Sequence, residues 1–167
     1  GQHLRDGRQM SEVLRVHEGI SGTPARQRCL DWLDRVRIGA AKRRLDQFPH
    51  ELSGGMRQRV MIAMSMLCSP RLLIADEPTT ALDVTVQADI LDLMAGLQKE
   101  QGTAIALITH DMGVVARMCD RIEVMRQGGF VESGSARAIF RTPKHAYTRS
   151  LLEAMPRIDA PDAPPVF

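Results

Sequence analysis

The pattern of apolar and polar positions changes character near residue 70. Before it, apolar residues recur at the three- and four-residue spacing of helices; after it, they also gather into short continuous runs. The helical spacing predicts two helices within 9–36, the second opening at Pro24, and further helices over 56–68, 84–99 and 112–119. We therefore expect a helical layer first and an α/β layer after it.

Two continuous apolar runs predict strands, Leu72–Ala75 and 103–109. Such runs are typical of strands buried on both faces of a parallel sheet, and the helix between them implies a right-handed crossover. Shorter strands are expected over 121–126 and 130–132, joined at Gly128-Gly129, and would extend the edge of the same sheet.

The last third of the chain predicts short helices over 136–140 and 146–155, separated by the Thr142-Pro143 breaker. The final stretch, IDAPDAPPVF, is rich in proline and is expected to form an extended tail. No internal repeat is evident in the sequence.

Composition narrows the class of protein. A chain of 167 residues with 44% hydrophobic content suits one domain with a sizeable core. The 22 basic and 20 acidic residues nearly balance, which argues against a nucleic-acid partner. Three widely spaced cysteines favour a reducing, cytosolic compartment.

No apolar run approaches the roughly 18 residues of a membrane span, and the first residues do not resemble a secretory signal. Any membrane attachment is therefore expected to be peripheral.

The segment LSGGMRQR places Ser53, Gly54 and Gly55 immediately before a helix. Glycines let an anion approach the backbone, and the N–H groups of a helix start favour negative charge. This arrangement is suited to binding phosphate. A serine that only caps a helix after a turn is the alternative, and the sequence leaves both open.

Acidic and histidine side chains follow the two predicted strands. Asp76 and Glu77 end the first, and Thr109-His110-Asp111 ends the second. Ligands of open α/β sheets bind at that edge. Asp76 is placed to hold Mg²⁺, and Glu77 could accept a proton from an attacking water. His110 could contact a phosphate oxygen or orient the water. A solvated turn with a capping aspartate, and an ordinary loop histidine, are the alternatives.

Together these motifs, followed by the TALD segment that ends at Asp83, resemble the ATP-binding-cassette (ABC) ATPase family. By that resemblance, Ser53-Gly54-Gly55 match the signature motif, although Met56 replaces its commoner glutamine. Asp76 and Glu77 match the Walker B pair, Asp83 the D-loop and His110 the switch histidine. The resemblance implies ATP and Mg²⁺ as cofactors, and an α/β fold that is a partial P-loop NTPase core with a parallel sheet, a helical subdomain in front and a short helical C-terminal tail.

The runs EPTTALDVTVQADILDLM and PKHAYTRSLLEAMP resemble the subunits that drive import of oligopeptides, dipeptides, glutathione or nickel, although Ala146 stands where proline is more usual. A surface helix packed on the domain edge is the other interpretation of the second run. The resemblance implies a second ATPase subunit and transmembrane permease subunits as partners, and a peripheral location on the cytoplasmic face of the bacterial inner membrane. The implied division is a helical subdomain over 1–70 that ends in the signature helix, the second half of the nucleotide-binding core over 71–134, and a C-terminal extension over 135–167.

The string G-x-x-x-x-G-K-[ST], whose backbone cradles phosphates, does not occur in the 167 residues. Because that loop comes with a strand and a helix of the sheet, apolar sheet surface is expected to be exposed here. Two other functions stay open: a truncated, non-catalytic ABC fragment that only dimerises, and a soluble ABC protein of DNA repair or translation. Serine and zinc hydrolases lack support, because neither G-x-S-x-G nor H-E-x-x-H occurs.

We predict that the 167-residue chain alone hydrolyses MgATP negligibly, because nothing in it replaces the phosphate-cradling loop. Phosphate release from the purified chain measures this directly. Turnover in the ordinary enzyme range of roughly 1–10³ per second would contradict the prediction.

Overall fold

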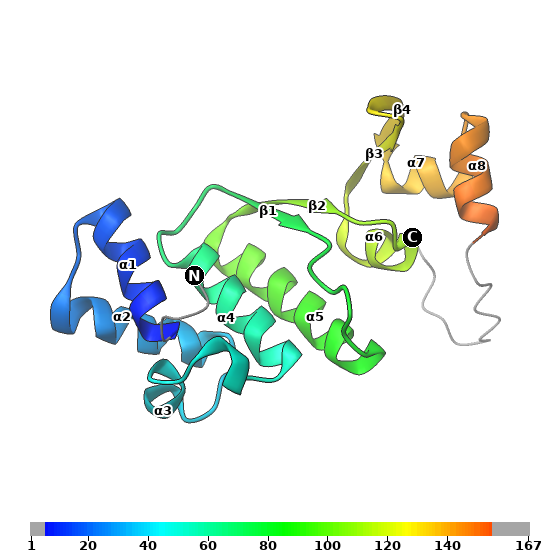
Figure 1. The fold of residues 1–167 in the computed structure, drawn as a ribbon. Helices are drawn as coiled ribbons and strands as arrows, with labels where there is room; N and C mark the ends of the chain where they lie inside the picture. The colour runs from blue at the N-terminus through cyan, green and yellow to red at the C-terminus, as the bar shows by residue number, and fades with distance from the viewer. Residues whose placement is uncertain (1–5, 155–167) are drawn as a thin grey trace. The chain divides into compact units, whose positions relative to one another are not determined.

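The computed structural model describes residues 6–154, and the predicted proline-rich tail lies outside them. The chain divides into two compact units, Gly1–Ala106 and Leu107–Phe167, with the division inside a strand. This division differs from the functional one drawn from the sequence, which remains a prediction. Figure 1 shows the path of the chain through its helices and strands.

Five helices and a 3₁₀ turn dominate the first unit: α1 (Asp6–Glu18), α2 (Gly22–Arg35), α3 (Ala41–Leu45), η1 (Pro49–Glu51), α4 (Gly54–Met66) and α5 (Val84–Gln101). Short α3 was not predicted, because its basic residues leave it without a helical apolar stripe. The predicted helices are otherwise confirmed to within a few residues.

The core of the first unit lies between these helices. Met10 and Leu14 of α1, Leu33 of α2 and Met66 of α4 are almost fully buried. Helices α1, α2 and α4 contact one another, and α4 also packs along α5 (Figure 1). The helical layer predicted from apolar spacing is therefore a packed unit with α4 at its centre.

Strands β1 (Leu72–Asp76) and β2 (Ala104–Ile108) form a two-stranded sheet. The N–H of Ala104 donates to the carbonyl of Arg71 at 2.9 Å, so the two strands begin side by side and run parallel. Leu73 and Ile105 line a narrow interior space together with apolar residues of α4 and α5. The helices of the first unit thus cover one face of β1.

The prediction that β1 is buried on both faces is wrong. Leu72 is 54% exposed and Ile74 is 63% exposed, and they alternate with the covered Leu73. Both faces of a strand are buried only when protein lies on each side of the sheet. Among the described residues, helices α4 and α5 pack on one side of β1 and leave the other side open.

The second unit contains α6 (Met112–Met118), β3 (Arg121–Arg126), β4 (Gly129–Ser135), α7 (Ala136–Arg141) and α8 (Ala146–Glu153). Strands β3 and β4 pair antiparallel through a tight turn at Gln127-Gly128. They form their own sheet, so the prediction that they extend the edge of the β1–β2 sheet is wrong. Because a two-residue turn allows immediate antiparallel pairing, the hairpin needs no other strand as a neighbour.

A small apolar core holds the second unit together. Its buried members are Val115, Ile122, Val124, Ala136 and Ile139. Tyr147 and Leu151 of α8 pack against this core, and the guanidinium of Arg126 lies over the Tyr147 ring at 4.8 Å. The late segment PKHAYT therefore packs on the hairpin, as the surface-helix interpretation of this run expects.

The side chain of Glu132 on β4 is hydrogen-bonded to the backbone at the start of α8. Its carboxylate accepts from the backbone N–H groups of Lys144 at 2.7 Å and His145 at 3.0 Å. The bond from Lys144 foremost, then the nearby hydroxyl of Thr148 and the bond from His145, lower the pKa of Glu132 from 4.5 to about 2. The ionised carboxylate also satisfies N–H groups that a helix start leaves without an intrahelical partner.

We predict that Glu132→Gln loosens α8. A carboxyl whose pKa is lower in the folded state stabilises above its unfolded pKa and loses that stabilisation as pH falls through the folded value. The parent should therefore protect the α8 amides more than the variant does at pH 6, and the difference should shrink between about pH 4.5 and 2. Hydrogen-exchange protection of α8 measures it, with Glu153→Gln at the exposed end of α8 as control. Equal protection in parent and variant at pH 6 would show that Glu132 does not hold α8.

Candidate functional site

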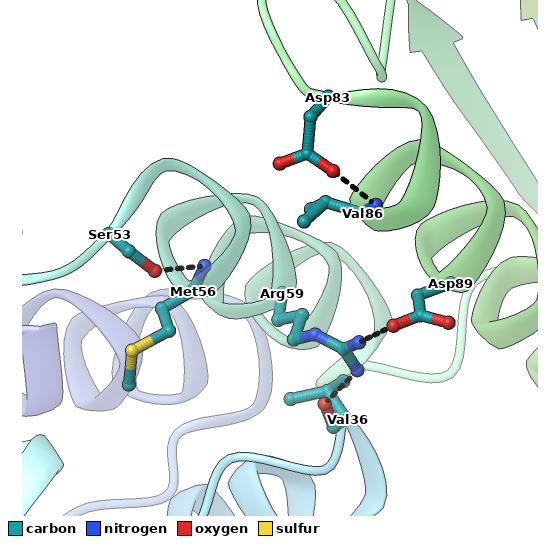
Figure 2. Close-up of polar contacts among 7 residues, drawn as sticks. All are labelled: Val36, Ser53, Met56, Arg59, Asp83, Val86 and Asp89. Atoms are coloured by element: carbon teal, nitrogen blue, oxygen red, sulfur yellow. Dashed lines mark hydrogen bonds and ion pairs between the residues drawn. The ribbon is translucent and has the colours of Figure 1, made fainter.

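The start of α4 carries the glycine-rich segment. Ser53 is the N-cap residue, and its Oγ accepts from the N–H of Met56 at 3.3 Å (Figure 2). Ser53 and Gly54 are exposed, and Gly55 is half-buried. The capping interpretation of Ser53 is thus correct, and its exposure also leaves the helix start accessible to an anion.

The start of α5 lies beside the start of α4. Asp83 is the N-cap of α5, and its Oδ1 accepts from the N–H of Val86 at 2.9 Å (Figure 2). A Cβ atom added to Gly55 would lie 2.7 Å from Cγ1 of Val86, and one added to Gly54 would lie 3.5 Å from Leu82. Gly55 therefore faces the first turn of α5, and Gly54 faces the residue directly before the cap of α5. Sequence reasoning missed this packing role, because the role depends on a partner helix about thirty residues away.

The segment between β1 and α5 has an unusual backbone. Glu77 and Ala81 both have positive φ, +46° and +63°, although neither is glycine. Such residues cost of order 1–3 kcal/mol each and cluster at functional sites. Asp76, directly before Glu77, is exposed at the end of β1. Two consecutive carboxylates thus lie where β1 ends and the turn begins.

A hydroxyl that sequence reasoning missed contacts Glu77. Oγ1 of Thr80 donates to Oε2 of Glu77 at 3.3 Å, and the Thr80 N–H donates to the Glu77 carbonyl at 3.2 Å. Threonine three residues after a glutamate is too common a spacing to signal this contact. The carboxylate of Glu77 is therefore oriented by its own turn.

His110 follows β2 and belongs to the second unit. It is exposed, and the next residue, Asp111, caps α6 by accepting from the N–H groups of Gly113 at 2.8 Å and Val114 at 3.2 Å. The structure brings Gly54 and Gly55, next to Ser53, close to Leu82 and Val86 on either side of Asp83. The placement of His110 with Asp76 and Glu77 at one phosphate site remains a prediction.

Metal binding by protein groups alone is not supported in residues 6–154, where no three His, Cys, Asp or Glu side chains gather around a common point. Mg²⁺ in nucleotide sites commonly uses one or two carboxylates together with phosphate oxygens. A single exposed carboxylate at a strand end, Asp76, fits that kind of site. In the same part of the chain, no helix is long and apolar enough to cross a bilayer.

This arrangement, with a parallel strand pair, an acidic strand end and a glycine-led helix start, places the chain in the α/β class of folds. The structure matches the dimeric structure of MJ0796, a bacterial ABC transporter cassette, with a TM-score of 0.69 and 30% identity. The match covers 82% of this chain and 59% of that one. A post-hydrolysis dimer of the same cassette, bound to ADP and Pi, matches with a TM-score of 0.69 and 29% identity, with the same coverage of both chains.

Sequence comparisons define the family. The family model described as ABC transporter matches residues 2–80, and the one described as oligopeptide/dipeptide transporter, C-terminal region, matches residues 131–165. The chain belongs to the family of ABC transporter ATP-binding proteins. The resemblance seen in the sequence and the predicted fold class are both confirmed.

Curated relatives are importer proteins by name. A putative peptide import ATP-binding protein of Brucella melitensis is 56% identical over 152 residues, which are 91% of this chain and 45% of the relative. The oligopeptide transport ATP-binding protein OppD of Salmonella typhimurium is 53% identical over 161 residues, covering 96% of this chain and 48% of the relative. OppD of Bacillus subtilis is 53% identical over 157 residues, covering 94% and 44%. The chain thus spans about half the length of the relatives it matches.

We predict that Gly55→Ala forces α4 and α5 apart, because the new methyl group would lie far inside contact distance of Val86. Overpacking of this kind costs about 1–3 kcal/mol. Gly96→Ala is the matched control: that glycine is exposed within α5 with no atom near its Cβ position, and alanine there should stabilise by about 0.5–1 kcal/mol. Urea unfolding followed by fluorescence of buried Trp32 measures both. A Gly55→Ala protein as stable as its parent would contradict the close approach.

Proposed function

We propose that this chain is part of the ATP-hydrolysing subunit that energises a membrane importer for peptides. The observation that carries the proposal is the start of α4, where Ser53 caps the helix and both Ser53 and Gly54 are exposed. The names of the relatives and the match of residues 131–165 to an oligopeptide/dipeptide transporter region support peptide import over DNA repair or translation.

In this proposal the helix start binds the terminal phosphate of an ATP molecule held by a second ATPase subunit. The backbone N–H groups of Gly54 and Gly55 and the hydroxyl of Ser53 are suited to anionic oxygens. Asp83, which caps the adjacent helix, contributes at the same junction. Each nucleotide is then enclosed by two polypeptides, in accord with the dimeric cassette that this chain resembles.

The carboxylates after β1 act on the other side of a nucleotide. Asp76 would help hold Mg²⁺ together with the phosphates, and the metal would offset the charge that builds up during transfer. Glu77 accepts a proton from the water that attacks the γ-phosphorus, while the bond from that phosphorus to the bridging oxygen of ADP breaks. His110 contacts a phosphate oxygen or orients the water.

The 167 residues contain no phosphate-cradling loop, so the complete nucleotide site includes protein that these residues do not supply. We propose that closure of the two ATPase subunits around ATP moves transmembrane permease subunits docked on the helical subdomain. The assembly would then lie peripherally on the cytoplasmic face of a bacterial inner membrane.

We predict that Glu77→Gln, introduced into the product of the complete gene and purified with its partner subunits, lowers kcat about 10²–10⁴-fold while ATP stays bound. The amide keeps the shape of the side chain and loses its basicity. Turnover and retained nucleotide are measured on the same sample, with Glu100→Gln at the exposed end of α5 as control.

Unchanged turnover in the Glu77→Gln protein would remove Glu77 from the mechanism. Recovery of nucleic acid in place of membrane subunits with the purified protein would overturn the importer assignment.

A further inference from the structure

Arg59 joins three helices through one side chain. It lies on α4, six residues after Ser53, and its side chain is only 15% exposed. One guanidinium nitrogen donates to the carbonyl of Val36 at 3.0 Å, and another lies 3.8 Å from Oδ2 of Asp89 (Figure 2). Arginine is suited to this because its planar fork reaches two acceptors at once.

The Val36 carbonyl belongs to the C-cap residue of α2. Carbonyls at a helix end lack intrahelical partners and carry the negative end of the helix dipole, so a cation there is favourable. Removing the guanidinium would leave that carbonyl without its charged donor in a partly buried place. The end of α2 is therefore attached to α4.

Asp89 is the contact of Arg59 on the third helix, and because its side chain is 57% exposed this contact is weaker than the hydrogen bond to Val36. Asp89 lies on α5, six residues after the cap Asp83. Arg59 follows Gly55 by four residues on α4, and Asp89 follows Val86 by three residues on α5. The starts of α4 and α5 are thus held by the approach of Gly55 to Val86 and, about one turn further along, by the Arg59 guanidinium.

We propose that Arg59 is a positioning residue for ATP hydrolysis: it sets the relative placement of the Ser53–Gly55 segment and the Asp83 turn, which must meet the nucleotide together. This inference rests on the proposed function. Arg59 itself touches no substrate. It acts through α4, whose N-terminal segment would shift relative to α5 if the guanidinium were removed.

The effect should fall on kcat. A misplacement of about 1 Å at a reacting site can cost about 10²-fold, so Arg59→Gln in the complete transporter should lower kcat by about 10–100-fold. The KM for ATP should change less than about threefold, because the second subunit holds the nucleotide before closure. Arg59→Lys keeps the charge but not the fork and should restore part of kcat.

Arg35→Gln is the matched control. Arg35 also joins α2 to α5, through an ion pair with Glu100 at 3.2 Å, but both side chains are well exposed and far along α5 from its start. Exposed ion pairs contribute little to stability. A kcat within about twofold of the parent is therefore expected for this variant.

A folded Arg59→Gln protein with parental kcat, or an equal loss in Arg35→Gln, would overturn the inference. If Arg59→Gln does not fold, Arg59→Lys decides: it should lower kcat several-fold, and parental kcat in that variant would overturn the inference. Glu77→Gln measured alongside separates the two proposals. Activity lost in Glu77→Gln but kept in Arg59→Gln overturns only the role of Arg59. Activity kept in Glu77→Gln removes Glu77 from the mechanism, and a parent transporter that does not hydrolyse ATP overturns the proposed function.

Discussion

The close approach of α4 to α5 is the constraint on which the first unit depends. The backbone at Gly55 lies so near Val86 that no side chain fits between them. This contact sets the capped start of α4 beside the capped start of α5, and Arg59 holds the same two helices further along. Two helix N-termini therefore act as one surface, with Ser53 and Asp83 at its edge. Because each cap is satisfied locally, the surface does not need a ligand in order to form.

Two of the strained backbone positions lie in the turn that leads into α5. The turn after β1 keeps Glu77 and Ala81 in left-handed conformations that glycine would adopt at lower cost. A structure retains such residues only when the surrounding contacts impose them. The second unit is organised differently: its hairpin core and the Glu132 anchor form an independent support for α8. The residues proposed to act on ATP thus lie at capped helix starts and in a turn with positive φ angles.

Much of this fold could be predicted from the sequence. Apolar spacing located the helices, and continuous apolar runs located β1 and β2, because both signals reflect local burial. Sheet membership could not be predicted: β3 and β4 form their own hairpin, and the outer face of β1 is open, since pairing and coverage depend on distant segments. In the site, Ser53 and Asp83 carried recognisable cap and motif signals. The roles of Gly55, Thr80 and Arg59 depend on partners that only the folded chain brings near.

We propose above all that the start of α4 binds the phosphate of a nucleotide held by another subunit. A structure of the complete transporter with a non-hydrolysable ATP analogue tests it most directly. The account predicts that the γ-phosphate oxygens lie about 3 Å from Ser53 Oγ and from the N–H groups of Gly54 and Gly55, with the remaining phosphates held by the second subunit. A closed, ATP-bound assembly in which Ser53 faces solvent or a permease subunit would contradict the account.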